Sequence, residues 1–303
     1  MRFRTEVPAD AMPHLATIVE TAAKLGTELC FRFHKDATVI FSLNSDPKLV
    51  CYAQLNTAAT FQDFRCESSA DGAIACRAHA ATVLASMKAC VGARAITWRL
   101  TSVHGKIVLC MHARGMDSSA ALEGTHHIPV QVSPREDVSQ WGPPALPAAL
   151  FTVRLPALDM LRSVVEKHAS IARWSGDSIA EPLQLSMWKD QHAAGALQLT
   201  AQAPMAALST TVRGLVCHEL QVEEAPGAAP PSALSMDIPG TGHVHASLVP
   251  AKELAKAVAS LPASEPTAIS LCARQNVLIH QPVETLGSIS VLIQTVALPA
   301  DVS

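Results

Sequence analysis

The chain has 303 residues, a formal net charge of −3 and a hydrophobic fraction of 49%. A chain of this length predicts two domains whose cores need neither disulfide nor metal. Its eight cysteines form no Cys-x-x-Cys pair, and it shows neither an apolar signal segment nor the roughly 20 consecutive apolar residues that span a bilayer. We therefore expect an intracellular protein with reduced thiols and no membrane partner, and any nucleic-acid site must gather its cations on one face.

Each half of the chain opens in the same way. A strand with alternating apolar residues at 2–7 leads into an amphipathic helix, and a strand at 151–155 leads into another. Each opening is followed by short strands, a second helix pattern and further strands. The predicted helices cover residues 10–25, 78–91, 156–174 and 250–261.

Strands far outnumber helices in this pattern. In the first half the remaining strands are predicted at 29–34, 38–43, 48–56, 95–100, 106–113 and 126–132. In the second half they are predicted at 183–188, 196–202, 210–220, 243–249, 267–273, 276–281 and 288–297. Because the connections are too short for helical crossovers, we predict an α+β fold of antiparallel sheets with a few helices on one side.

A proline-rich segment separates the two halves. Residues 133–149 contain four prolines, which stiffen a linker. We therefore predict a first domain at 1–132, a connector at 133–149 and a second domain at 150–303. A Pro/Ala/Gly-rich stretch at 223–242 predicts a surface loop inside the second domain.

All predicted helices are one-sided. The helix at 156–174 places Leu158, Leu161 and Val165 on one arc and Arg162 and Glu166 opposite. The other helices also carry one or two cations on the polar face or at its border. A solvated surface explains such charges unless the helix faces converge on one place.

No enzymatic motif occurs in the sequence. The phosphate-loop, His-Glu-x-x-His and Gly-x-Ser-x-Gly patterns are all missing. His243 and His245 share a strand face, but no cysteine or carboxylate stands at ligand spacing, and His126 and His127 point to opposite faces. We therefore predict no catalytic residue, no metal site and no cofactor.

Three stretches carry a family resemblance. They are MRFR at residues 1–4, HIPVQVSPR at 127–135 and LPALDMLRSVVEK at 155–167. In this order and spacing they resemble the Hus subunit of the heterotrimeric DNA-damage checkpoint clamp, whose fold is similar to that of proliferating cell nuclear antigen. The resemblance covers nearly the whole chain, and the chain departs from it at the 223–242 stretch and in its high alanine content.

The resemblance implies a non-catalytic ring subunit. Two different clamp subunits complete the ring, an ATP-dependent clamp loader places it on duplex DNA without sequence specificity, and it serves checkpoint signalling and repair proteins in the nucleus. Helices would line the hole and touch phosphates. The candidate DNA-facing cations are Lys24, Arg77, Lys88, Arg162, Arg173, Lys252 and Lys256, with Lys167 ranked lower. Changing Lys24, Arg162, Lys252 and Lys256 to Glu should leave folding nearly intact, because exposed charges contribute little to stability.

The resemblance also implies that edge strands pair between subunits. By position we expect these edges at residues 106–113 and 211–220, although an interior place for each strand stays open. The interface candidates are Lys106, Val108, Cys110, Val212, Leu215 and Cys217. The candidates for a client-peptide groove beneath the connector are Ile128, Val130 and Trp141.

Two alternatives remain open. A replication-type homotrimeric clamp would have the same fold and differ in the complementarity of its strand edges. A two-domain enzyme with a site assembled from distant residues would need a deep pocket with converging polar groups and perturbed pKa values.

Overall fold

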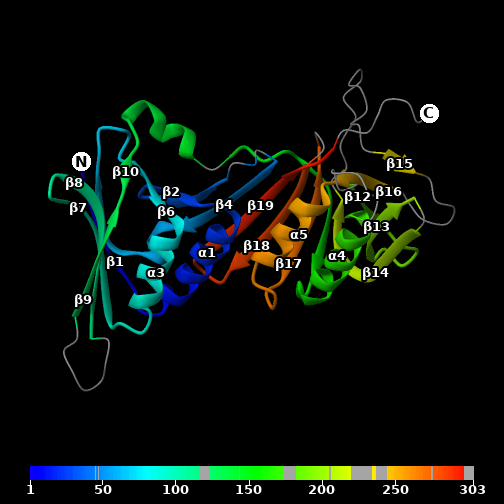
Figure 1. Cartoon of the computed structure of the whole chain (residues 1–303), viewed down its shortest axis with the longest axis horizontal. Coiled ribbons are helices and arrows are strands. Elements are labelled where there is room, and N and C mark those ends of the chain that lie inside the picture. Colours follow the sequence, from blue (N-terminus) through cyan, green and yellow to red (C-terminus); the bar gives the residue numbers. More distant parts are fainter. Residues whose placement is uncertain are drawn as a thin grey trace. The chain divides into compact units, whose positions relative to one another are not determined.

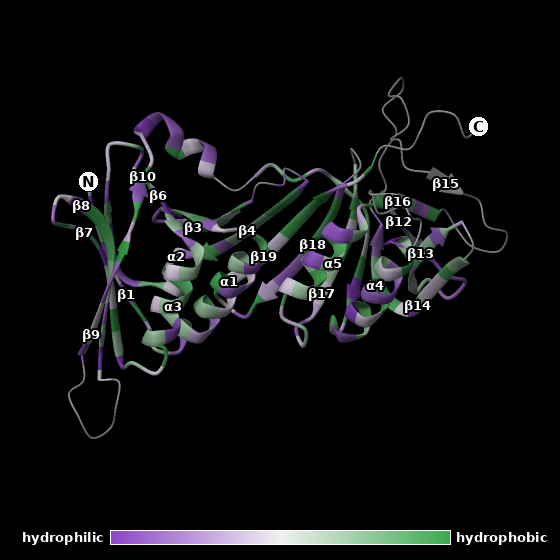
Figure 2. Cartoon of the chain, viewed as in Figure 1, coloured by the Kyte–Doolittle hydropathy of each residue, from purple (hydrophilic) through white to green (hydrophobic). Residues whose placement is uncertain are grey.

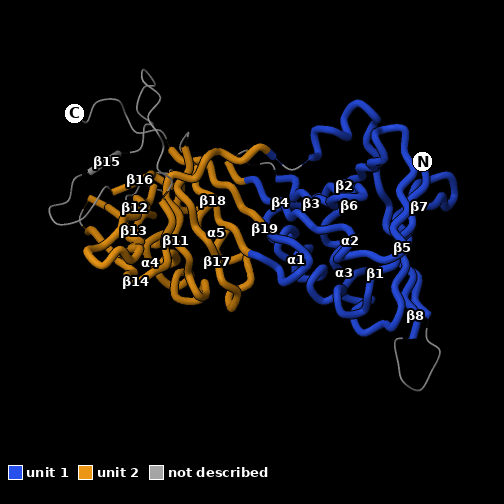
Figure 3. The backbone as a smooth tube through the Cα atoms, turned by 180° about the vertical axis from the view of Figure 1, so that it is seen from behind, with its two compact units in different colours: residues 1–45, 50–144, 282–289 blue, residues 46–49, 145–281, 290–303 orange. Residues whose placement is uncertain are grey.

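The computed structural model describes residues 1–44, 46, 48–115, 123–142, 144–173, 182–204, 206–219, 234–236, 244–273 and 276–296. It divides into two compact units (Figures 1 and 3). The first unit comprises Met1–Ser45, Val50–Pro144 and Pro282–Ile289, and the second comprises Asp46–Leu49, Ala145–Gln281 and Ser290–Ser303. Each unit is therefore built mainly from one half of the chain and includes a short segment of the other half.

The first unit contains two antiparallel sheets. One has the order β5-β1-β7-β8-β9, and the other has the order β10-β6-β2-β3-β4. The strands of the first sheet are β1 (Arg2–Val7), β5 (Gln62–Glu67), β7 (Ala95–Val103), β8 (Lys106–Arg114) and β9 (Glu123–Pro129). Those of the second are β2 (Glu28–Phe33), β3 (Ala37–Leu43), β4 (Leu49–Asn56), β6 (Ile74–His79) and β10 (Gln131–Val132).

Helices α1 (Ala11–Leu25) and α3 (Ala80–Cys90) pack against each other and against this sheet framework. Helix α1 begins after Asp10, whose carboxylate accepts the Ala11 N–H at 3.0 Å. Its apolar stripe, including Leu15 and Ile18, is completely buried. A short helix α2 (Thr57–Thr60) and the 3-10 helix η1 (Arg135–Trp141) complete the described helices of this unit.

Both faces of the β2-β3-β6 region are covered. Helix α1 contacts β2 and β3, while η1 contacts β2 and β6. The cluster beneath η1 joins Val138 to Cys30, Phe41 and Ala75. This sheet therefore has one face covered by α1 and an opposite face covered by η1, which follows β10.

The second unit is a single antiparallel sheet with helices on one face. Its order is β19-β18-β17-β11-β14-β13-β12-β16-β15. Its strands are β11 (Ala149–Leu155), β12 (Leu183–Lys189), β13 (Gly195–Ala203), β14 (Ala206–Glu219), β15 (Leu234–Met236), β16 (Val244–Val249), β17 (Thr267–Cys272), β18 (Asn276–Val283) and β19 (Gly287–Gln294). Helices α4 (Asp159–Ala172) and α5 (Ala251–Ser260) pack together, and α4 also contacts β13.

Figure 2 shows hydrophilic bands on α4 and α5, and largely hydrophobic strands within the sheets. Helix α5 buries Leu254 and Val258 and leaves Lys252 exposed. The α+β prediction, with antiparallel sheets and a few amphipathic helices, is therefore confirmed. Of the predicted loop at 223–242, only residues 234–236 are described, and they form β15.

Two strands of the first unit were not predicted from the sequence, and one predicted helix was too long. Strand β5 has no fully buried residue, and β6 is built largely from small alanine and cysteine residues, so neither shows apolar alternation. Residues 78 and 79, predicted as helical, continue β6 and pair with Leu29 and Glu28 of β2. Helix α3 consequently begins at Ala80.

No helix in the described ranges is both long and apolar enough to cross a membrane. All eight cysteines are free thiols, and six of them are buried. Burial raises the pKa of the Cys51 thiol to about 12. Such thiols stay protonated near neutral pH and are poor nucleophiles.

We predict that Gly26→Ala destabilises the first unit by about 1–3 kcal/mol because a Cβ at this position overpacks the junction between α1 and β2. The added carbon would collide with the Leu43 carbonyl oxygen and the Ser42 hydroxyl. That hydroxyl is fixed because it donates to the Ala22 carbonyl at 2.7 Å. Urea unfolding followed by circular dichroism measures the change.

The matched control is Gly142→Ala. Gly142 has a negative φ of −69°, and a Cβ there would meet only the Ser139 carbonyl oxygen, at 3.2 Å. If both variants unfold at the same urea concentration, the tight α1–β3 contact is not a packing constraint.

Candidate nucleic-acid interface

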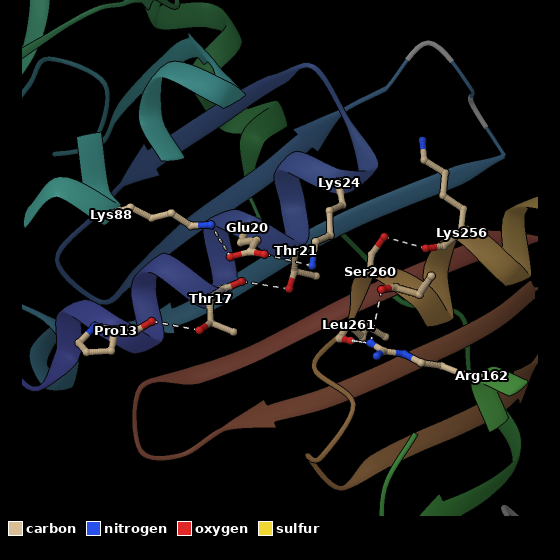
Figure 4. A network of polar contacts seen from close by, with 11 residues as sticks. Pro13, Thr17, Glu20, Thr21, Lys24, Lys88, Arg162, Lys256, Ser260 and Leu261 are labelled. Carbon is tan, nitrogen blue, oxygen red and sulfur yellow. Dashed lines mark hydrogen bonds and ion pairs between the residues drawn. The ribbon is translucent and has the colours of Figure 1, made fainter. Parts of the chain in front are cut away.

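The helix faces of the first unit carry a small charge cluster. Lys24 of α1 and Lys88 of α3 are exposed, and their Nζ atoms lie 3.2 and 3.0 Å from the carboxylate of Glu20 (Figure 4). Hydrogen bonds from Lys88 and Lys24 lower the pKa of Glu20 below its usual range. The cluster therefore keeps one net positive charge and ties the two helices together at their surface.

Arg77 does not belong to this face, because it lies on strand β6 and not at the start of a helix as predicted. It lies on β6 directly opposite Cys30 of β2, and Cys30 belongs to the cluster beneath η1. Residues directly opposite in a sheet share a face. Arg77 therefore points away from α1 and α3, because β6 continues to His79 where a helix was expected.

Arg162 is on α4, but its guanidinium is engaged inside the second unit. Its Nε donates to the Val258 carbonyl at 3.1 Å, and its Nη2 donates to the Ala259 carbonyl. The same Nη2 also donates to the Leu261 carbonyl (Figure 4). These carbonyls lie at the C-terminal end of α5, where the last turn lacks backbone donors. Arg162 thus fastens α4 to the end of α5, and the expectation that it is a freely replaceable surface charge is wrong.

The remaining candidates lie on the helices of the second unit or at their ends. Lys252 is exposed in the first turn of α5, and Lys256 is half-buried one turn later. Arg173 follows the last residue of α4, and its Nε donates back to the Ala169 carbonyl at 3.1 Å. Lys167, which was ranked lower from the sequence, is exposed, as Lys252 is. It forms no ion pair with another residue in the described part of the chain.

Taken together, the four long helices are a basic part of an acidic chain. With the capping Arg173, they carry seven cations and four carboxylates, whereas the whole chain has a formal net charge of −3. The cations are Lys24, Lys88, Arg162, Lys167, Arg173, Lys252 and Lys256, and the carboxylates are Glu20, Asp159, Glu166 and Glu253. Such a surface suits phosphate backbones because neutralising them releases counterions.

The first strand edge was predicted in the wrong place. Strand β8, which carries Lys106, Val108 and Cys110, pairs with β7 on one side and β9 on the other. It is an interior strand, because the following segment folds back as β9. The edges of this sheet are β9 and β5, and each has a single partner strand in the described part of the chain.

The second strand edge was predicted in part correctly. Strand β14 pairs with β13 along most of its length, but with β11 only from Val216 to Glu219. Val212 therefore lies where β14 has a single partner among the described strands. Leu215 is buried at the end of that stretch, and Cys217 lies in the following stretch, where β14 pairs with β11 alone among the described strands.

The residues expected in a peptide groove are mostly packed into the first unit. Ile128 is 1% exposed and belongs to the core. The Trp141 ring packs edge-on against Phe41, with 5.9 Å between ring centroids. Val130 is half-buried, and its N–H donates to the Ile107 carbonyl at 3.2 Å. Of the three candidates, Ile128 cannot contact a bound peptide without unfolding of the sheet.

The described residues contain no cluster of three or more His, Cys, Asp or Glu side chains arranged to hold a metal ion. His245 lies 3.3 Å from the carboxylate of Glu219, which also pairs with Lys189 at 2.8 Å. Hydrogen bonds from these two partners lower the pKa of Glu219, and the bond from Lys189 has the larger effect. His243 lies outside the described residues.

Comparison with solved structures identifies the fold. Proliferating cell nuclear antigen from Thermococcus kodakaraensis is similar with a TM-score of 0.64 and 14% identity, covering 97% of this chain and 100% of that chain. The homologous antigen from Entamoeba histolytica is similar with a TM-score of 0.63 and 10% identity, covering 97% and 99%. The chain thus has the sliding-clamp fold.

Sequence comparison then identifies the family. The model of the Hus1-like protein family matches residues 1–297, and the chain belongs to that family. The checkpoint protein hus1 of Schizosaccharomyces pombe is 28% identical over 232 residues, which cover 74% of this chain and 75% of the relative. The human checkpoint protein HUS1 is 25% identical over 178 residues, covering 57% and 63%. The family resemblance inferred from the sequence is confirmed.

We predict that Arg162→Gln lowers the free energy of unfolding of the second unit by about 2–3 kcal/mol, because it removes charge-assisted hydrogen bonds to three carbonyls. Lys167→Gln, on the same helix, should change it by less than about 0.5 kcal/mol. Urea unfolding of both variants measures the difference. Equal stabilities would mean that Arg162 is an ordinary surface charge.

Proposed function

We propose that this chain is a non-catalytic subunit of a heterotrimeric ring that encircles duplex DNA without sequence specificity and acts in DNA-damage checkpoint signalling and repair. The single observation that carries the proposal is the basic surface of the α1–α3 and α4–α5 helix pairs within an acidic clamp-fold chain. Family membership and the checkpoint names of the relatives support it. In this proposal the clamp domains are residues 1–132 and 150–303, joined by 133–149.

The proposed DNA contacts are cations on the long helices or at their ends. Lys252 and Arg173 are exposed, and Lys24 and Lys88 are exposed but share Glu20. Lysines reach phosphate through flexible stems and read no base edge, which allows a ring to slide. Lys256 belongs to this set by its position one turn after Lys252, and Lys167 joins it by exposure.

The proposed ring contacts are two strand edges, β9 and part of β14. Strand β9 and the stretch Ala206–Arg213 of β14 each offer backbone groups without a strand partner among the described residues. Unpaired edges are templates for pairing with another chain. We propose that each edge pairs with a different clamp subunit, that an ATP-dependent loader opens the ring, and that it works in the nucleus.

We predict that Lys24→Gln, Lys88→Gln, Lys252→Gln and Lys256→Gln together weaken retention of the partner-assembled ring on DNA. Each lost phosphate contact should reduce the slope of log K against log salt by about 0.9, equally for different DNA sequences. The measurement is DNA binding across a salt series. Lys35→Gln with Lys106→Gln is the control, because both are exposed lysines outside the helices.

Unchanged retention and slope in the helix variant would contradict the proposed DNA-facing surface. Light scattering of the chain alone distinguishes the two clamp classes. A monomer agrees with a heterotrimer, whereas a stable homotrimer at micromolar concentration would contradict it.

A further inference from the structure

The exposed face of the first unit's five-stranded sheet carries a row of arginines. Arg4 of β1 lies directly opposite Arg65 of β5 on one side and Arg99 of β7 on the other. Directly opposite residues have Cβ atoms about 4.5–5.5 Å apart, and like charges there destabilise a sheet. All three side chains are on exposed residues, whereas the alternate residues of β1 and β7, such as Phe3 and Trp98, are buried.

A cavity of about 340 Å³ lies beside this row. Its lining residues are Arg4, Thr97, Arg99, His112, Arg114 and Thr125. Thr97, His112 and Thr125 form one cross-strand row over β7, β8 and β9. The cavity is therefore bordered by three guanidinium groups and two hydroxyl groups.

The polar groups of the cavity are partly organised already. The His112 Nδ1 lies 2.9 Å from the Thr125 hydroxyl, and the Arg114 Nε donates to the His112 Nε2 at 3.0 Å. Two carboxylates lie beside these groups at long ion-pair distances: Glu6 is 3.9 Å from Arg4, and Glu123 is 4.0 Å from Arg114 and 3.9 Å from His112. In the described ranges no carboxylate forms an ion pair with Arg99 or Arg65. Among the described residues, the arginine row is thus only partly neutralised, by Glu6.

We propose that this face binds a phosphorylated segment of a partner protein, with the phosphoryl group held between Arg4, Arg99 and Arg114. A phosphoserine or phosphothreonine brings a charge of about −1.5 to −2 and three acceptor oxygens. Guanidinium groups match these oxygens with paired hydrogen bonds, and the hydroxyls of Thr97 and Thr125 add further donors. The bound dianion offsets the repulsion within the arginine row.

A compact dianion fits this face better than a nucleic-acid backbone does. Glu6 and Glu123 flank the cavity arginines, so an extended polyanion would lie across one carboxylate or the other. The three cavity cations are all arginines, which suit a fixed oxygen geometry rather than sliding contacts. This surface is separate from the helix faces proposed to contact DNA.

The test uses the full chain and a synthetic peptide library with a fixed central phosphoserine or phosphothreonine, beside the same library without phosphate. The wild-type chain should retain the phosphorylated library selectively. For the best-retained peptide, fluorescence anisotropy should show about tenfold weaker binding for Arg99→Gln and for Arg114→Gln, as expected when a charge-assisted hydrogen bond is lost. Arg154→Gln, an exposed strand arginine of the second unit, is the matched control and should bind normally.

Folding of the variants is checked by their melting temperatures. Arg99→Gln should melt no lower than wild type, because it removes a like-charge neighbour of Arg4. Equal retention of the two libraries, or wild-type affinity in both variants, would overturn the proposal. A duplex oligonucleotide that competes for the same arginines more strongly than the phosphopeptide would also overturn it, in favour of a nucleic-acid surface.

Discussion

The organisation of this chain depends on the one-sided burial of its helices against antiparallel sheets. Helix α1 buries Leu15 and Ile18 completely, and α5 buries Leu254 and Val258, so the opposite side of each helix must face away from the sheet. The hydrophobic effect fixes these orientations without reference to charge. A chain with a net negative charge can therefore present a basic helix surface in each unit.

The same constraint separates the possible functions of the two sheet faces. In the first unit, the face of β2 and β6 opposite α1 is sealed by η1, and Arg77 is confined to that side. The other sheet buries Phe3 and Trp98 and exposes the arginine row on its far face. The helix faces and the arginine cavity thus use different parts of the fold, whereas the cavity and the β9 edge share Thr125.

The sequence predicted features that arise from local periodicity and missed those that arise from tertiary pairing. The stripes of α1 and α4 are regular, so both helices were predicted closely. Strands β5 and β6 lack apolar alternation and were therefore not predicted. Because β6 was missed, the predicted start of α3 was too early and Arg77 was assigned to the wrong face. Two other features depend on contacts between residues that are distant in the sequence, so residue spacing could not predict them. They are the hydrogen bonds from Arg162 to carbonyls of α5 and the interior position of β8 in its sheet.

The most direct test of a clamp subunit closed by strand pairing is hydrogen exchange of the full chain, alone and assembled with its two partner subunits. Amides of residues 123–128 and 206–213 should become protected on assembly, because backbone hydrogen bonds slow exchange. Amides of the interior strand Lys106–Arg114 should change little. Assembly without new protection in either edge segment would contradict this account of the ring.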